Sequence, residues 1–171
     1  GGTLRIQGNA ASVSQRVYLT SYRDDTVGGD TNGDGNATSP APNNYQGIDF
    51  QNGSTGQIVG AVMRYGGFDN YPYTYGVVKN LGGNVTIANT RITLNNEGVR
   101  QQSGSMAISQ SSIHANTSYG VNNISSNSVA ATSTWWGSAS GPYHATLNAG
   151  GAGNSVSNNI TFSPWLTSDP N

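Results

Sequence analysis

Residues 76–121 read GVVKNLGGNVTIANTRITLNNEGVRQQSGSMAISQSSIHANTSYGV and contain a repeat. The pair Gly76-Val77 returns as Gly98-Val99 and Gly120-Val121, at spacings of 22 residues (98−76 and 120−98). An earlier pair, Gly47-Ile48, precedes Gly76-Val77 by 29 residues (76−47). A period of about 22 residues indicates a solenoid, in which each repeat forms one coil that stacks on the next.

Each repeat contains further short apolar segments. A polar turn and a second apolar segment follow each Gly-apolar pair, at residues 58–60, 85–87, 106–108 and 129–131, and a third segment occurs at 92–94 and 113–115. Three strands of three to five residues, with alternating apolar and polar positions, describe one coil of a β-solenoid. Asn95 and Asn116 lie about one period apart. We therefore predict a ladder of stacked amides that joins the coils.

Composition narrows the class of protein. The 171 residues are enough for one domain, and Gly, Asn, Ser and Thr supply nearly half of them, whereas charged residues make up only 9%. This composition argues against a helical bundle. The net charge of −1 argues against disorder and against a nucleic-acid partner. No apolar run reaches the roughly 20 residues of a membrane span, and the absence of Cys excludes disulfides and thiolate sites.

On these repeats, and on two further segments, the chain resembles the right-handed parallel β-helix repeat family of the pectate-lyase-like superfamily. One segment is residues 18–25, which lead into an Asp-rich loop, and the other is a terminal segment built around Trp135-Trp136-Gly137, Gly141-Pro142 and Ser163-Pro164-Trp165-Leu166. The resemblance implies an all-β, right-handed parallel β-helix of about 22-residue coils, with long loops at one corner and a Trp-rich C-terminal cap. Members of the family are secreted or surface proteins of microbes and include polysaccharide lyases and hydrolases, adhesins and spacers.

We expect a single β-helix domain over residues 1–171. It carries an acidic loop at 24–44, a Tyr-rich insertion at 67–75 and the cap segment at 132–171. The opening residues 2–8 are similar to a coil in mid-solenoid, so we expect the chain to be part of a longer protein. The same feature predicts an open sheet edge on the first coil, through which copies can associate end to end.

The acidic loop holds four of the eight acidic residues of the chain. Asp30-Thr31-Asn32-Gly33-Asp34-Gly35 matches the first half of a calcium-binding loop, but the Glu that would close the loop is replaced by Ala41. We predict a structural Ca²⁺ site, and the alternative is a solvated turn that holds no ion. The predicted ligands are Asp24, Asp25, Asp30, Asn32, Asp34 and Asn36.

Aromatic residues gather around the second insertion, which leaves the solenoid at the same corner as the acidic loop, one coil further on. Aromatic rings flanked by polar groups suit the apolar faces of sugars, so we predict a polysaccharide or cell-surface glycan as the partner. The alternative is that the rings anchor the two loops. The predicted ligand-binding residues are Tyr45, Arg64, Tyr65, Phe68, Tyr71, Tyr73 and Tyr75.

No catalytic residue is predicted. His114 and His144 lack a nucleophile motif and are expected to be ordinary surface or turn residues, and Arg64, Arg91 and Arg100 are candidate lyase bases by position alone. Three functions remain open: an extracellular or cell-surface binding module, a fragment of a polysaccharide lyase or hydrolase, and a structural spacer of a surface protein. The binding module accounts best for the two adjoining insertions.

Overall fold

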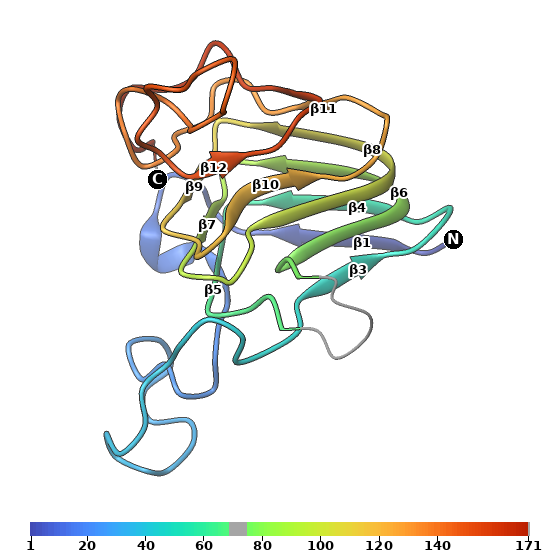
Figure 1. The fold of residues 1–171 in the computed structure, drawn as a ribbon. Coiled ribbons are helices and arrows are strands. Elements are labelled where there is room, and N and C mark those ends of the chain that lie inside the picture. Colours follow the sequence, from blue (N-terminus) through green and yellow to red (C-terminus); the bar gives the residue numbers. More distant parts are fainter. Residues whose placement is uncertain (69–74, 171) are drawn as a thin grey trace.

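The chain folds into two parallel β-sheets wrapped around one apolar core. The computed structural model describes residues 1–68 and 75–170. Every pairing between strands in those residues is parallel. The sequence therefore predicted the all-β class and the parallel stacking correctly. Figure 1 shows the strands stacked in layers, with the acidic loop extending away from the stack.

The larger sheet has nine strands in the described residues and the smaller sheet has four. The larger one comprises β1 (Thr3–Gln7), β3 (Ile48–Phe50), β4 (Thr55–Val59), β6 (Val78–Ala88), β8 (Val99–Ser109), β10 (Tyr119–Asn123), β11 (Val129–Ala130), β12 (Ser155–Val156) and β13 (Ile160–Thr161). The smaller one has the order β2 (Val17–Leu19), β5 (Ala61–Arg64), β7 (Arg91–Thr93), β9 (Ser112–His114). A short 3₁₀ helix, η1 (Val13–Gln15), precedes β2.

Two coils differ from the expected three-strand pattern. The first and second apolar segments are continuous in β6 and again in β8, each of which runs for 11 residues. The strand bends instead of ending, because the buried Asn80 side chain accepts hydrogen bonds from the backbone N–H of Gly82 and Gly83. Pairing with β8 continues on both sides of this bend, with a shift of register at residue 81.

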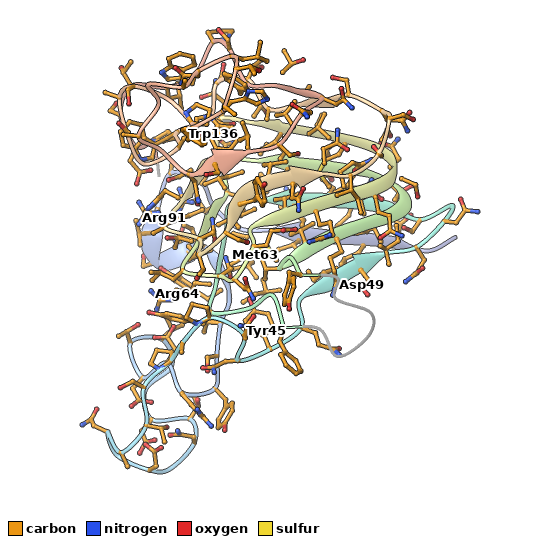
Figure 2. The ribbon with its side chains drawn as sticks, viewed as in Figure 1. Tyr45, Asp49, Met63, Arg64, Arg91 and Trp136 are labelled. Carbon is orange, nitrogen blue, oxygen red and sulfur yellow. The ribbon has the colours of Figure 1, made fainter. Side chains whose placement is uncertain are left out.

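The core is formed by in-register rows of apolar side chains. Ile58, Ile87 and Ile108 lie side by side on β4, β6 and β8, and all three are buried. Met63 belongs to a matching row on the smaller sheet and contributes to the same cluster. Trp136 is fully buried against this core. Figure 2 shows Met63 inside the stack and Trp136 near the end opposite to the acidic loop.

The predicted Asn ladder is present and is longer than expected. Asn95 Nδ2 donates to Asn116 Oδ1 at 3.0 Å, and Asn116 Nδ2 donates to Asn154 Oδ1 at 3.0 Å. The left-handed backbone falls on the preceding residues, Leu94 (φ 58°) and Ala115 (φ 55°), and not on the amides themselves. The ladder thus satisfies buried polar groups at one corner of three successive layers.

The first coil ends in a sheet edge. β1 lies at the end of the strand order and pairs only with β4 among the described strands. Its Leu4 side chain is exposed. End-to-end association through this edge stays a prediction. In the described parts of the chain, no helix combines the length and the apolar character that a bilayer crossing requires.

Candidate functional site

The outer face of the smaller sheet carries a groove with a cavity of about 280 Å³. Strand residues alternate between the two faces, so Met63 points into the core while its neighbours Val62 and Arg64 point outward. Register places Arg64, Thr93 and His114 in one outward row across β5, β7 and β9. We call this feature the sheet groove, and its main lining residues are Arg16, Tyr18, Val62, Arg64, Arg91 and His114.

Three of the seven basic residues of the chain line the sheet groove. Arg16 is buried, and its guanidinium donates to the carbonyls of Ala10 and Asn89. Burial and the repulsion of Arg91 lower the pKa of Arg16, although the side chain stays charged at neutral pH. Figure 2 shows Arg64 and Arg91 on the same side of the stack. The groove therefore combines an apolar floor with a positive rim.

Arg64 connects the sheet groove to the acidic loop. Its guanidinium contacts the Asp24 carboxylate at 2.6 Å and 2.7 Å and donates to the Thr26 hydroxyl at 2.5 Å. Burial alone would raise the pKa of Asp24, but hydrogen bonds from Thr20 and Thr26 and the charge of Arg64 outweigh it and hold this pKa below its ordinary value. Asp24 is therefore part of a fixed ion pair at the base of the loop.

The other acidic side chains of the loop form a separate cluster. Carboxylate oxygens of Asp25, Asp30 and Asp34 all lie within 4.8 Å of one another. Oδ1 of Asp25 and Oδ1 of Asp34 are shielded from solvent and have no hydrogen-bond partner in the described residues. Burial, together with repulsion from Asp30, Asp34 and Asp24, raises the pKa of Asp25. This cluster can hold a metal ion, because a cation would satisfy the unpaired oxygens and relieve the repulsion.

The remaining predicted metal ligands lie around this cluster. Asn32 donates its side-chain amide to Asp34 Oδ2 at 2.8 Å, so it supports one carboxylate of the cluster. Asp24 faces Arg64 instead of the cluster. Asn36 is exposed at the end of the Asp30–Gly35 turn. The structure therefore brings together three of the six predicted side chains, with Asn32 beside them.

The two loop excursions adjoin at their bases. Tyr45 and Gly66 form a parallel bridge, and Phe68 N donates to the Tyr45 carbonyl at 3.1 Å. The Tyr45 hydroxyl donates to the Leu19 carbonyl at 2.9 Å and its ring packs against the core, so this side chain anchors the corner. Burial raises the pKa of Tyr45 well above its ordinary value. Figure 2 places Tyr45 between the stack and the acidic loop.

The other predicted aromatic residues are dispersed. Tyr65 lies under the Arg64 guanidinium, with 5.4 Å between its ring centre and Arg64 Cζ. Phe68 is exposed, and Tyr75 is half-buried and accepts a hydrogen bond from Arg100 on its carbonyl. Tyr71 and Tyr73 lie outside the described residues. Of the predicted ligand-binding residues that the structure describes, Arg64 is the one that lines the sheet groove.

His114 is the residue of the groove that sequence reasoning undervalued. Its Nε2 faces Asp169 at 4.0 Å, and Arg91 Nη2 contacts the same carboxylate at 2.7 Å. Burial, reinforced by Arg91 and opposed by Asp169, lowers the pKa of His114, so the imidazole is neutral at pH 7. The repeat spacing alone did not reveal it, because Arg64 and His114 are 50 residues apart (114−64) and share the outward row only through their pairing with Thr93. The other histidine, His144, is buried and accepts backbone hydrogen bonds as part of a turn.

A second cavity, of about 460 Å³, lies on another part of the surface. It is lined by the exposed rings of Tyr119 and Tyr143 and by polar groups such as Ser157. Among the described residues, its lining contains no Asp, Glu, Lys or Arg. Neither a protein-family model nor a curated protein nor a solved structure matches this chain.

Proposed function

We propose that this protein is an extracellular or cell-surface β-helix module that binds a glycan chain in the sheet groove, with Ca²⁺ ordering the acidic loop beside it. One observation carries the proposal: the outer face of the four-stranded sheet offers an apolar floor, a Tyr18 ring and several hydrogen-bond donors in one concavity. Sugars present apolar C–H faces together with hydroxyl and carboxyl groups. The apolar floor and the ring of the groove can contact the C–H faces, and the donors can bind the polar groups.

The proposed role of Ca²⁺ is structural. Asp25, Asp30 and Asp34 supply oxygen ligands, with further oxygens from Asn32, the Asn36 carbonyl or water. Asp24 and Arg64 lie between this site and the sheet groove. Ordering of the loop therefore stabilises the position of Arg64, which lines the groove.

We also infer the finer architecture from the resemblance stated above. It comprises right-handed coils of about 22 residues, loops at one corner and a Trp-rich segment that covers the last coil. The in-register stacking of Val78, Val99 and Val121 and the complete burial of Trp136 support this inference. A solenoid of this kind presents long flat faces, which suit extended polymers.

The binding proposal is tested with soluble polysaccharides in affinity electrophoresis, with Ca²⁺ and with chelator. We expect retention by the wild-type protein and a loss of retention in Tyr18→Ala, which removes a groove side chain. Tyr119→Ala is the matched control, because it removes a half-exposed tyrosine from the other cavity. Loss of retention in Tyr119→Ala alone would move the site to that cavity. Release of reducing or unsaturated ends would favour the lyase or hydrolase instead.

A further inference from the structure

The chain contains two Asn-Gly pairs, and the fold holds them differently. Asn32-Gly33 lies in the acidic loop, and Asn52-Gly53 lies in the turn between β3 and β4. Figure 1 shows the acidic loop extending away from the stack, whereas that turn joins two strands of the stack. In an Asn-Gly pair the backbone nitrogen of the glycine can attack the side-chain amide of the asparagine, because no Cβ hinders the close approach.

The attacking nitrogen is free in one pair and engaged in the other. The N–H of Gly33 has no hydrogen-bond partner in the described residues, and a Cβ added to this glycine would meet nothing within 4 Å. Gly53 N donates to the Gly82 carbonyl at 3.3 Å, which holds the turn against the next coil. Attack requires the nitrogen to leave such a hydrogen bond, so it is opposed at Gly53 and unopposed at Gly33.

The amide that would be attacked is positioned in the acidic loop. Asn32 Oδ1 accepts a long hydrogen bond, 3.4 Å, from the Asp34 N–H, and this Asx turn folds the side-chain carbonyl across the Gly33 peptide. The same N–H can stabilise the charge that develops on Oδ1 during the attack. Asn32 Nδ2 also donates to Thr38 Oγ1 at 3.1 Å. Asn52 is more exposed, and its side chain makes no hydrogen bond within the part of the chain that the structure describes.

We propose that Asn32-Gly33 is a self-modification site, at which the loss of ammonia adds a carboxylate to the acidic loop. Gly33 N bonds to Asn32 Cγ, the Cγ–Nδ2 bond breaks, and ammonia leaves with the proton of the Gly33 N–H. Water then opens the cyclic imide at either of its carbonyls, so that residue 32 becomes an aspartate or an isoaspartate. The sequence of steps needs no oxidant or reductant, and water is its co-reactant.

The added carboxylate changes the balance of charge in the loop. The Nδ2 group that is lost from Asn32 donates to Asp34 Oδ2 at 2.8 Å, so an attraction is replaced by a repulsion between two carboxylates. The third position of a calcium-binding loop takes either Asp or Asn, so Ca²⁺ can use the added oxygen. The modification therefore makes the loop less stable without Ca²⁺ and raises its affinity for the ion. This consequence rests on the proposed calcium site, whereas the modification itself does not.

The modification is tested by incubating the full chain at neutral pH in chelator and sequencing its proteolytic peptides by mass spectrometry at intervals. We expect Asn32 to convert to the acid at least several-fold faster than Asn52, which is the matched control within the same chain. In concentrated urea the two rates should converge, because both pairs lose their folded surroundings. Conversion of Asn52 as fast as that of Asn32 in the folded protein would overturn the proposal, and so would the absence of conversion at Asn32.

The consequence is tested on Asn32→Asp, which carries the aspartate product, with Asn52→Asp as the matched change of charge. In chelator, Asn32→Asp should melt at a lower temperature than the wild type, and in calorimetric titration it should bind Ca²⁺ several-fold more tightly. Asn52→Asp should resemble the wild type in both measurements. Equal Ca²⁺ affinity of Asn32→Asp and the wild type would overturn the role of residue 32 as a ligand. Binding of Ca²⁺ by neither protein would overturn the calcium site and leave the modification, which is measured separately, intact.

Discussion

The sheet groove and the acidic loop both gather charged side chains, but they are held in different ways. The groove residues stand on paired strands whose inner faces form the core, so their spacing is set by the sheet. The loop residues stand on a long excursion between β2 and β3, where three carboxylates repel one another. The sheet therefore holds the groove residues in place, whereas the loop carboxylates lack such a frame and can hold a cation.

The largest expected effect concerns the scaffold. Asn116→Ala should lower the free energy of unfolding by about 2–4 kcal/mol, because it leaves the buried Asn95 N–H without its partner and removes the amide contacts with Asn95 and Asn154. Urea unfolding followed by circular dichroism measures the change. Asn158→Ala, at an exposed amide, is the control and should change stability by less than about 0.5 kcal/mol. Equal stabilities of the two variants would show that the Asn ladder does not hold the coils.

The second effect concerns the loop. Ca²⁺ at a hundredfold excess over its Kd should stabilise the wild-type protein by about 2.7 kcal/mol, seen as a rise of the melting temperature. In chelator, the variant Asp25→Asn should be more stable than the wild type, because the repulsion between carboxylates is relieved. In Ca²⁺ the same variant should be less stable than the wild type, because a ligand of the ion is lost. Asp49→Asn should respond to Ca²⁺ as the wild type does. An identical melting curve of the wild type with Ca²⁺ and with chelator would contradict the calcium site.

The third effect concerns Asp24, which joins the two regions. Because its pKa is lowered in the folded protein, the Asp24 contribution to stability is complete above the unfolded pKa of about 3.9 and is lost as the pH falls through the folded value. The difference in unfolding free energy between wild type and Asp24→Asn should therefore be largest near neutral pH and shrink below pH 4. Urea titrations at several pH values measure it. A difference that stays constant down to pH 2.5 would mean that the ion pair with Arg64 does not stabilise the fold.

The same contrast explains what could be predicted from the sequence. The spacing of Gly76, Gly98 and Gly120 predicted parallel stacking, and that of Asn95 and Asn116 predicted the amide ladder, because a solenoid turns sequence period into spatial register. Asn154 also belongs to this ladder, but it follows Asn116 by 38 residues and not by one repeat, so the repeat spacing did not predict it.

The candidate site was less predictable for the same reason. Asp30 and Asp34 were recognisable because turn-forming ligands are close in sequence. Arg64 and His114 come from different coils, and their common row became visible only with the register of the smaller sheet. Asp169 lies on a tail that follows no repeat, and its contact with Arg91 is a tertiary one. Asp24 is separated from the other acidic residues because it pairs with Arg64, and this partner lies on a strand distant in sequence.

The smallest expected effect concerns the pH response of the groove. His114 faces Arg91 and Asp169 among the charged groups of the described residues, and burial together with Arg91 lowers its pKa below 6.5. Because the pKa of His114 is lower in the folded protein than in the unfolded chain, the unfolded chain binds more protons as the pH falls through about 6.5, and the stability contribution of the neutral imidazole should be lost on acidification. Urea titrations between about pH 7.5 and pH 5 measure the free energy of unfolding. His114→Asn should show a smaller loss of stability over this range, and the same slope in wild type and variant would place the titrating group elsewhere.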